Sequence, residues 1–256
     1  MIHKTAIVHR DAEVAEDCEI GPYCVIGSGV TLGAGCRLHS HVVLEGPMRA
    51  GEHNEFFPFC CAGQKTQDLK YKEEPTHLVI GDHNVFREFV TLHRATSPGD
   101  RTVVGSHNAI LAYSHIAHDC IVGDHVIMSN NATLAGHVTV EDRVVLGGFT
   151  AIHQFCRIGA MANTGGCSKV VQDIPPFMTA DGNPAQVRTI NKVGLERNGV
   201  TQEARHQILA AYKLLYREDG LNVADAVERI RKELPPSEGL QRLCDFVSAS
   251  KRGISR

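Results

Sequence analysis

The sequence of 256 residues contains no tryptophan, and aromatic residues make up only 5% of it. A broad globular core normally uses large rings, whereas a narrow core can be filled by Val, Ile, Leu, Ala and Cys. Aliphatic residues and the 24 glycines are abundant by contrast. The composition therefore favours a narrow core.

Long apolar runs and blocks of like charge are also missing. No stretch approaches the ~18 apolar residues of a membrane span, and residues 1–14 lack the apolar run of a signal peptide. The net charge is only −3 and no block of five or more like charges occurs, which argues against a nucleic-acid partner. We therefore expect a cytoplasmic protein with no membrane segment and no nucleic-acid partner.

What the sequence does contain is a hexapeptide repeat. Every sixth residue from Ile2 to Phe56, and again in the same phase from Ile80 to Val170, is almost always a large aliphatic residue or Phe. A glycine often follows, as expected for a short strand that ends in a turn where Gly relieves φ restrictions. Three such strands per coil of about 18 residues predict a parallel β-helix of triangular section.

The repeat also explains most of the nine cysteines. Six occupy the small inward position four residues after the large apolar one: Cys18, Cys24, Cys36, Cys60, Cys120 and Cys156. We expect them to fill the core rather than to form disulfides or bind metal. Reduced thiols agree with a cytoplasmic location.

Two polar segments, residues 63–77 and 95–102, interrupt the repeat but keep its six-residue phase. They are predicted to be loops that leave the coil and return to it. Loops on a rigid scaffold often carry binding residues, although a solvated insertion has the same composition. Counting 18 residues per coil places Ala62, where the first loop leaves, three coils before Ile116.

The predicted domain organisation has two parts. A β-helix with these two loops spans residues 1–189, and a proline-rich connector begins at about residue 175. Apolar residues then recur at helical spacing, so residues 190–256 are predicted to form a C-terminal α-helical domain.

Histidines gather around the stretch SHIAHDC, residues 114–120. His118, His137 and His153 follow three repeat residues that are 18 apart, and coils stack ~4.8 Å apart, so we expect these imidazoles to cluster on one edge, with His115 at the turn beside them. Seven other histidines show no comparable register and are expected to be surface or turn residues: His39, His41, His53, His83, His93, His107 and His125.

Such a cluster has two chemical interpretations. Three neutral imidazoles with an open position would make a zinc-type hydrolytic site, as in a carbonic-anhydrase-like hydratase on the same β-helix. Alternatively, one His oriented by a carboxylate would be a general base for an alcohol. Spacing alone does not separate the two.

Longer motifs are distributed over nearly the whole chain: QDLKY (67–71), EPT (74–76), HIAHDC (115–120), NNATLAGHV (130–138), HQFC (153–156), GGCS (165–168), QDIPP (172–176) and AYKLLYR (211–217). On these motifs the chain resembles the UDP-N-acetylglucosamine O-acyltransferases that open lipid A biosynthesis in Gram-negative bacteria. The resemblance implies a left-handed β-helix and a homotrimer with active sites between subunits. It implies transfer of an R-3-hydroxyacyl chain from acyl carrier protein to the 3-hydroxyl of UDP-N-acetylglucosamine, with no metal and no cofactor beyond the carrier's phosphopantetheine arm.

The resemblance also implies residue roles. His118 matches the general base, Asp119 the acid that orients it, and Gly136 the backbone N–H donor to the oxyanion. Gly166 matches the residue that limits acyl-chain length, and a glycine there implies a longer chain. Substrate-contact positions are matched by Asp68, Lys70, His115, His137, His153, Gln154, Asn191 and Arg197, the last two near the helical domain.

The chain departs from the family pattern at residues 193–199. Many members read close to GLKRRG where this chain has GLERNG (194–199), so Glu196 and Asn198 replace basic residues, and Val193 replaces an acidic one. These three departures make the implied contacts with uridine and with carrier protein less certain than the implied chemistry. An N-acyltransferase acting on a 3-amino sugar is the related alternative, but such enzymes usually carry an extra N-terminal domain, whereas here the repeat begins at residue 2.

Overall fold

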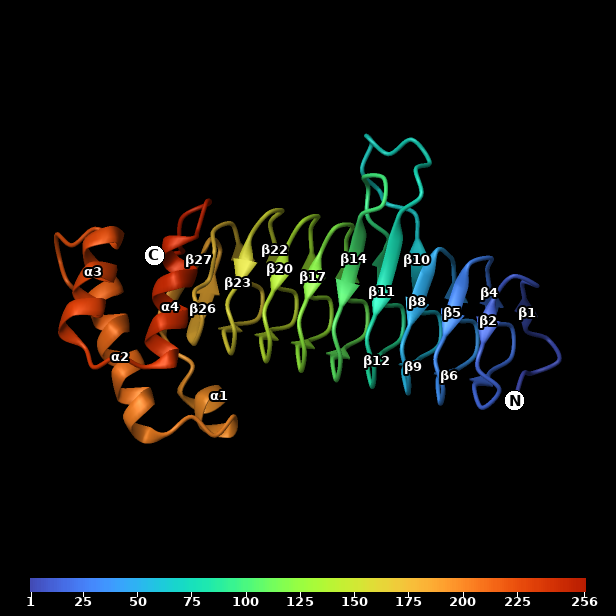
Figure 1. Ribbon diagram of the computed structural model, residues 1–256, viewed down its shortest axis with the longest axis horizontal. Helices are drawn as coiled ribbons and strands as arrows, with labels where there is room; N and C mark the ends of the chain where they lie inside the picture. The colour runs from blue at the N-terminus through green and yellow to red at the C-terminus, as the bar shows by residue number, and fades with distance from the viewer.

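The computed structural model describes residues 1–256 and shows a long stack of short strands with a cluster of helices at its C-terminal end (Figure 1). The strands form three parallel sheets, the faces of a triangular prism. The first sheet runs in the order β1-β4-β7-β10-β13-β16-β19-β22-β25. Its strands are Ile7–Val8, Val25–Ile26, Val43–Leu44, Cys61–Gln64, Thr91–His93, His115–Ile116, Thr133–Leu134, Ala151–Ile152 and Lys169–Val170.

The second and third sheets complete each coil. The second sheet, β2-β5-β8-β11-β14-β17-β20-β23, comprises Glu13–Val14, Val30–Leu32, Met48–Ala50, His77–Ile80, Arg101–Val104, Ile121–Val122, Thr139–Val140 and Arg157–Ile158. The third sheet, β3-β6-β9-β12-β15-β18-β21-β24-β26-β27, comprises Glu19–Ile20, Arg37–Leu38, Glu55–Phe56, Val85–Phe86, Ala109–Ile110, Ile127–Met128, Val145–Leu146, Asn163–Thr164, Met178–Gly182 and Ala185–Ile190.

The predicted inward positions are buried. Ile116, Leu134 and Ile152 pair in register on β16, β19 and β22, and each is at most 2% exposed. All six cysteines assigned to the core are buried as well, and burial raises the pKa of the Cys120 thiol to about 12. A thiol with so high a pKa is a poor nucleophile and metal ligand, so these cysteines act as small apolar residues.

The glycines of the repeat have a different purpose from the one expected. The positive-φ residues at the turns are mostly not glycine; Asp119 and His137 both have φ of 62°. Gly33, which follows a repeat residue, is not among the positive-φ glycines, but a Cβ atom there would lie 2.6 Å from the backbone carbonyl carbon of Gly51 in the next coil. Glycine is required at such positions because adjacent coils approach closely, not because the turn needs positive φ.

The two predicted loops leave the β-helix on the same side and lie side by side (Figure 1). The first connects β10 to β11 and the second β13 to β14, and the Gly99 N–H donates to the Pro75 carbonyl across them at 2.9 Å. Ala62 pairs with Leu92, which pairs with Ile116, so Ala62 lies two coils before Ile116. The sequence-based count of three was wrong because the loops together add one coil's length of residues.

Four of the seven histidines that were predicted to share no register do form one column. His53, His83, His107 and His125 stack in register at successive turns between the second and third sheets, with ring centroids 4.9 Å apart. Their sequence intervals of 30, 24 and 18 residues each equal one coil, since the loops lengthen the first two. A fixed count of 18 residues therefore missed this register.

The segment expected as a connector is partly ordered into strands. β26 adds to the third sheet in parallel, and β27 folds back against it as an antiparallel hairpin that covers the last coil. Four helices follow: α1 Lys192–Arg197, α2 Gln202–Tyr216, α3 Val223–Glu233 and α4 Glu238–Ser248. None of the four has the length and continuous apolar character needed to cross a membrane.

The helices are fixed to the end of the β-helix by packing and polar contacts. The Arg157 guanidinium lies 4.2 Å from the centroid of the Phe246 ring on α4, and the Tyr212 hydroxyl on α2 donates to the Arg188 carbonyl of β27 at 2.5 Å. Thr201 is the N-cap of α2, because its hydroxyl accepts from the Ala204 N–H at 3.2 Å.

Candidate active site

His118 and Asp119 form a hydrogen-bonded pair at the turn that follows β16. The His118 Nδ1 lies 2.7 Å from the Asp119 Oδ2, and the two side chains are only 15% and 9% exposed. An ionised carboxylate can only accept, so Nδ1 carries the proton and Nε2 holds the lone pair. The pair therefore directs the other ring nitrogen, Nε2, away from the acid.

The carboxylate is held ionised by its surroundings. Burial by itself would raise the pKa of Asp119, but hydrogen bonds from His118 and Thr96, together with the nearby His137, hold it below its usual value. The Asp119 backbone N–H donates to the buried Thr102 hydroxyl at 2.8 Å, which anchors the turn. An ionised Asp119 can fix the tautomer of His118 and stabilise its imidazolium form.

Both loops reach this pair through two threonines that sequence analysis did not identify. The Thr96 hydroxyl lies 3.0 Å from the His118 Nδ1, and its backbone N–H donates to the Asp119 Oδ1 at 3.3 Å. The Thr66 hydroxyl lies 3.0 Å from that of Thr96 and accepts from the Asp68 N–H at 3.0 Å. A continuous set of hydrogen bonds thus joins Asp68 on the first loop to His118.

Gly136 lies one coil beyond His118, in the same register position. A Cβ atom on Gly136 would lie 2.4 Å from the His118 Cε1 and 2.6 Å from its Nε2, so only glycine leaves room for the ring. The Gly136 backbone N–H makes no hydrogen bond within the chain, unlike the His137 N–H, which donates to the His118 carbonyl. The free donor therefore lies beside the basic nitrogen, as an oxyanion-binding group should.

The other predicted histidines do not all join this site. The ring centroids of His118 and His137 are 5.3 Å apart, edge to face, so these two are neighbours as expected. His137, however, lies one coil beyond Asp119 at the equivalent position. Its ring stacks on that of Phe155, with the ring centroids 4.7 Å apart. His153 and Gln154 are exposed at the next turn, and the His153 Nδ1 donates to the Gln154 carbonyl at 3.1 Å. His118 follows its repeat residue by two positions, His137 by three and His153 by one. The three histidines therefore lie in neighbouring columns of the β-helix and do not stack in a single column.

His115 on β16 and His93 on β13 lie near His118. Burial, followed by the nearby His93 and His118, lowers the pKa of His115 to about 4, and its Nδ1 lies 2.7 Å from the Thr91 hydroxyl. Burial, followed by His118, also lowers the pKa of His93, whose ring meets that of His115 edge to face at 4.8 Å. Both rings are therefore neutral at neutral pH, and each has one ring nitrogen that can donate a hydrogen bond and one that can accept.

His93 was wrongly assigned to the surface or a turn. It is only 6% exposed, and its Nδ1 is buried without a hydrogen-bond partner. Its burial could have been inferred from the sequence, because it directly follows the repeat residue Leu92 at the point where the second loop leaves.

The site also contains a group of side chains of the kind that bind metals. The ligand atoms of His118, Asp119 and His137 lie within 4.8 Å of one another. The group fits a metal poorly, because the Asp119 Oδ2 is already the partner of the His118 Nδ1, and the His137 Nε2 lies 3.7 Å from the same oxygen. A metal ion would have to displace that hydrogen bond.

The remaining predicted residues occupy two further surfaces. Asp68 and Lys70 lie on the first loop, where the Asp68 Oδ1 accepts from the Lys70 N–H at 2.9 Å and the lysine is exposed. Asn191 and Arg197 line a pocket of about 460 Å³ beside β21, β24 and β26 of the third sheet. His118 lies instead on the edge between the first and second sheets, so one chain does not bring these two sets together.

The Asn191 amide also has a structural task. Its oxygen accepts from the Gly194 N–H at 3.0 Å as the N-cap of α1, and its nitrogen donates to the Met161 carbonyl at 2.8 Å. The departures from the family pattern are accommodated locally: Glu196 pairs with Arg205 at 3.5 Å, and the Asn198 oxygen accepts from Arg143 at 2.8 Å.

Gly166, the predicted chain-length residue, is exposed beyond β24. A Cβ atom there would lie 3.4 Å from the Gly148 carbonyl oxygen, an ordinary contact distance, so the position has room for a side chain.

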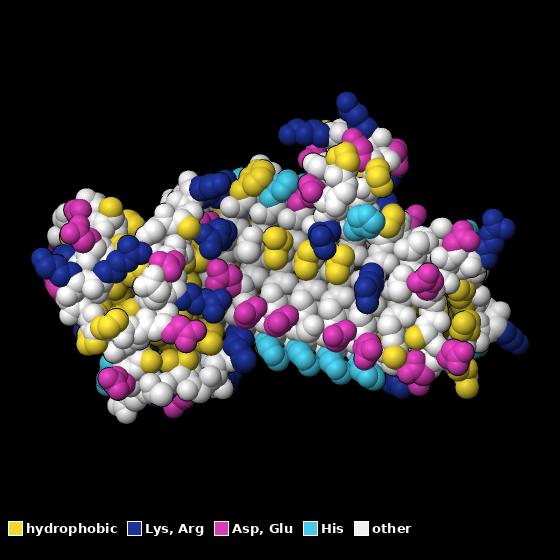
Figure 2. All heavy atoms as spheres, viewed as in Figure 1, with side chains coloured by type: hydrophobic (Ala, Val, Ile, Leu, Met, Phe, Trp, Pro, Cys, Tyr) yellow, Lys and Arg dark blue, Asp and Glu magenta, His cyan; other side chains and the backbone are white.

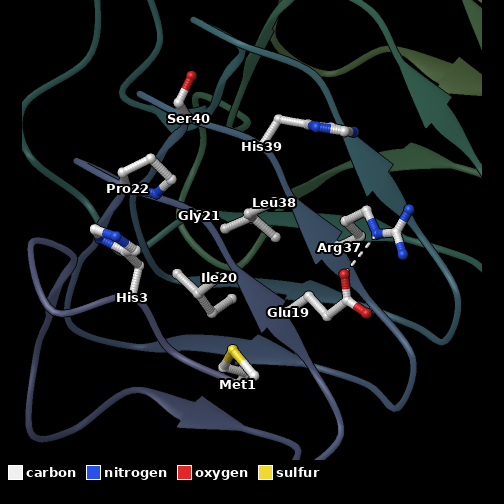
Figure 3. A pocket seen from close by; sticks show the side chains of 10 residues that line it. All are labelled: Met1, His3, Glu19, Ile20, Gly21, Pro22, Arg37, Leu38, His39 and Ser40. Carbon is white, nitrogen blue, oxygen red and sulfur yellow. Dashed lines mark hydrogen bonds and ion pairs between the residues drawn. The ribbon is translucent and has the colours of Figure 1, made fainter.

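A cavity of about 600 Å³ lies elsewhere, beside β3 and β6 near the N-terminus (Figure 3). An ion pair between Glu19 and Arg37, 2.8 Å long, closes one side, and His3 and His39 lie at its margin without an acidic partner among the cavity residues. This cavity lacks a base, an oxyanion donor and a nucleophile in mutual reach, and it is several coils from His118. Its size alone does not make it the active site.

Comparisons with known proteins agree with the geometry. A family model described as UDP N-acetylglucosamine O-acyltransferase, domain 2, matches residues 173–255, and one described as bacterial transferase hexapeptide (six repeats) matches residues 1–46 and 101–136. The chain is 50% identical to the acyl-[acyl-carrier-protein]--UDP-N-acetylglucosamine O-acyltransferase of Thermodesulfovibrio yellowstonii, covering 100% of this chain and 99% of that protein. The enzyme of the same name from Stutzerimonas stutzeri is 44% identical, over 83% of this chain and 82% of that one.

Solved structures give the same result. LpxA from Acinetobacter baumannii superposes with a TM-score of 0.96 at 46% identity, covering 100% of this chain and 99% of that one. LpxA from Bacteroides fragilis, a UDP-N-acetylglucosamine acyltransferase, superposes with a TM-score of 0.97 at 34% identity over 100% of both chains. These matches confirm the predicted fold, a left-handed parallel β-helix of hexapeptide repeats followed by a C-terminal α-helical domain.

Proposed function

The chain belongs to the UDP-N-acetylglucosamine O-acyltransferase family, and from this premise we propose that His118 is the general base of its reaction. The enzyme transfers an acyl chain from acyl carrier protein to UDP-N-acetylglucosamine, the first step of lipid A biosynthesis. The observation that carries the proposal is the arrangement of His118 between the ionised Asp119 and the free N–H of Gly136. As the finer substrates we propose an R-3-hydroxyacyl donor and the 3-hydroxyl of the glucosamine ring as acceptor.

The proposed mechanism begins with proton removal. The His118 Nε2 takes the proton from the sugar hydroxyl while that oxygen attacks the thioester carbonyl carbon. The carbonyl oxygen becomes an oxyanion and accepts from the Gly136 N–H. Asp119, through its hydrogen bond to the His118 Nδ1, stabilises the imidazolium that forms.

The intermediate then collapses. The carbonyl re-forms, the C–S bond breaks, and the imidazolium returns its proton to the departing thiolate, so that the products are the sugar ester and the free thiol of the phosphopantetheine arm. A thioester is already activated toward an oxygen nucleophile, so the step requires a base and a hydrogen-bond donor and no further cofactor. The neutral His115 and His93, with Asp68, Lys70, His137, His153 and Gln154, are the proposed substrate contacts around the base.

We propose that the active enzyme is a homotrimer in which neighbouring subunits complete each site. Asn191, Arg197 and Gly166 lie away from the His118 edge within one chain, so a neighbour would have to supply them. An exposed aromatic ladder, Tyr23, His41, Phe59, Phe89 and Tyr113, stacks along the edge between the third and first sheets with centroid spacings of 4.8 to 5.1 Å. Contiguous exposed aromatic surface of this kind supports contact with another copy.

The proposed protein partner is acyl carrier protein, and the proposed location is the cytoplasm. The basic side chains of Lys70 and Arg197 are exposed and can attract an acidic carrier. Core thiols in the reduced form fit a reducing compartment.

The other readings of the histidine cluster have less support. Relatives named as O-acyltransferases match the whole chain, which does not favour a hydratase or an N-acyltransferase of 3-amino sugars. Acyl-transfer assays after treatment with a chelator test the hydratase directly, because the mechanism above requires no metal and activity that depends on bound zinc would contradict it.

An acyl-transfer assay with UDP-N-acetylglucosamine and R-3-hydroxyacyl carrier protein tests the proposal. His118→Ala should lose nearly all turnover with its oligomeric state unchanged, whereas the control His39→Ala should be close to wild type. His39 pairs with Glu55 at 2.8 Å, several coils away. Retention of most activity by His118→Ala would refute the assignment of the base.

A further inference from the structure

The most ordered set of titratable side chains outside the active site is the histidine ladder, which we define as His53, His83, His107 and His125. Its three consecutive ring pairs have centroid distances of 4.9 Å and interplanar angles of 15°, 6° and 7°. All four side chains are exposed, and Figure 2 shows a row of histidines along one edge of the β-helix. This edge, between the second and third sheets, is not the edge that carries His118.

Backbone geometry holds the ladder in place. Each of the four residues has a positive φ, between 53° and 59°, at the same turn of successive coils. At one end, His53 lies over Gly35, where a Cβ atom would come 2.2 Å from the His53 Nδ1. At the other end the column continues with Arg143, whose guanidinium donates to Asn198. The turns therefore set the spacing of the rings along the edge.

A row of carboxylates accompanies the ladder. Each of Glu52, Asp82, Asp124 and Asp142 immediately precedes a residue of this column, and all four are exposed. Figure 2 shows the acidic row directly beside the histidines. Asp82, Asp124 and Asp142 each accept a backbone N–H from the preceding coil, at 2.7, 2.7 and 3.0 Å. These carboxylates are therefore fixed, and they make the edge attractive to cations.

We propose that the histidine ladder is a binding site for a divalent transition metal of the zinc type. Neutral imidazoles are preferred ligands of such ions, and Zn–N bonds of about 2.0–2.1 Å require nitrogens about 3.3 Å apart in a tetrahedral site. Exposed rings with centroids at 4.9 Å reach that separation by tilting toward each other. No three ligand atoms of the ladder lie within the 4.8 Å that groups His118, Asp119 and His137, so each ion is held by two adjacent imidazoles and completed by water.

Four rings in a row contain two independent adjacent pairs, which sets the stoichiometry. The ladder binds two ions per chain when saturated, one between His53 and His83 and one between His107 and His125. The inference does not depend on the acyl-transfer assignment, because no ladder residue contacts the active-site pair.

The test is calorimetric titration of the full, untagged chain with Zn²⁺, with His118→Gln/His137→Gln as the background so that the active-site group does not contribute. In that background, His107→Gln should bind one ion fewer, since only the His53–His83 pair is left. His83→Gln/His107→Gln should bind two fewer, because it leaves no adjacent pair. The matched control His9→Gln/His206→Gln also removes two exposed histidines but keeps the ladder, and it should bind as the background does.

Two outcomes would overturn the proposal. One is equal Zn²⁺ stoichiometry in His83→Gln/His107→Gln and in the matched control. The other is an absence of binding in the background at millimolar Zn²⁺. Thermal unfolding of each variant without metal confirms that it is folded, and acyl transfer by His83→Gln/His107→Gln with His118 and His137 intact should equal wild type.

Discussion

The hydroxyl oxygens of Thr66 and Thr96 lie 3.0 Å apart and join the two loops directly above the base. Thr96 also lies 3.0 Å from the His118 Nδ1 and donates its N–H to Asp119. Thr66 also accepts from the Asp68 N–H, so hydrogen bonds connect the first loop to the surroundings of His118, the proposed base.

Thr96→Val is expected to lower kcat about 10-fold, the equivalent of one lost hydrogen bond of about 1.4 kcal/mol. KM for the sugar nucleotide should change little, because Thr96 positions the base rather than the substrate. Steady-state kinetics measures both constants. Thr96→Ser, which restores the hydroxyl, should recover most of the rate; wild-type kcat in Thr96→Val would show that the contact has no positioning role.

Gly136→Ala is expected to reduce kcat by about 100-fold or more. A positioned general base contributes about 100- to 10,000-fold to the rate, so displacing it can cause a loss of this size. The added Cβ would lie 2.4 Å from the His118 Cε1, so the imidazole must move. The Gly136 N–H is retained, and the backbone φ is compatible with alanine, so thermal unfolding should remain near that of wild type.

The matched control for that change is Gly239→Ala on α4, where the nearest atom to an added Cβ is 3.7 Å away. It should keep full activity. If Gly136→Ala were as active as this control, the close packing of residue 136 against the base would be irrelevant to catalysis.

The β-helix could be predicted because its core is periodic. Ile116, Leu134 and Ile152 are related by a constant interval, so their pairing follows from counting. His118 and Asp119 were identified from the family motif, and the structure adds the tautomer, the ionisation of Asp119 and the free Gly136 N–H.

The contributions of the loops could not be predicted in the same way. Thr66 and Thr96 meet only because two segments without periodicity fold against each other, and no interval relates them. The register of His53 and His83 was missed for a related reason, since the length of the first loop had to be known before the coil could be counted. Periodicity locates core residues, whereas side chains on loops depend on tertiary contacts.

His115 predicts a stability that depends on pH. Its pKa is lowered from 6.5 to about 4 by burial and by His93 and His118, so the unfolded chain binds a proton in a range where the folded chain does not. The free energy of unfolding should therefore fall as the pH drops from about 6.5 to about 4, by at most about 3.4 kcal/mol from this residue.

Urea unfolding at fixed protein concentration across this pH range measures the effect. His115→Gln should show a smaller decrease than wild type, and part of the decrease should persist because the pKa of His93 is lowered in the same way. Identical slopes for wild type and His115→Gln would contradict the assignment of His115 as a neutral buried residue.

Gly166→Met tests what limits the length of the acyl chain. A Cβ atom at this exposed position meets nothing closer than the Gly148 carbonyl oxygen at 3.4 Å, so we expect Gly166→Met to fold normally. If the acyl groove passes Gly166, the methionine shortens it, and the preferred donor should change to a shorter hydroxyacyl chain. Each methylene excluded from an apolar groove costs about 0.8 kcal/mol, or roughly fourfold in kcat/KM, so loss of a four-carbon extension amounts to about 200-fold.

Assays with a series of hydroxyacyl carrier proteins measure this change in chain-length preference. Wild type should favour donors longer than ten carbons; a clear ten-carbon preference in wild type, or an unchanged profile in Gly166→Met, would place the end of the groove elsewhere.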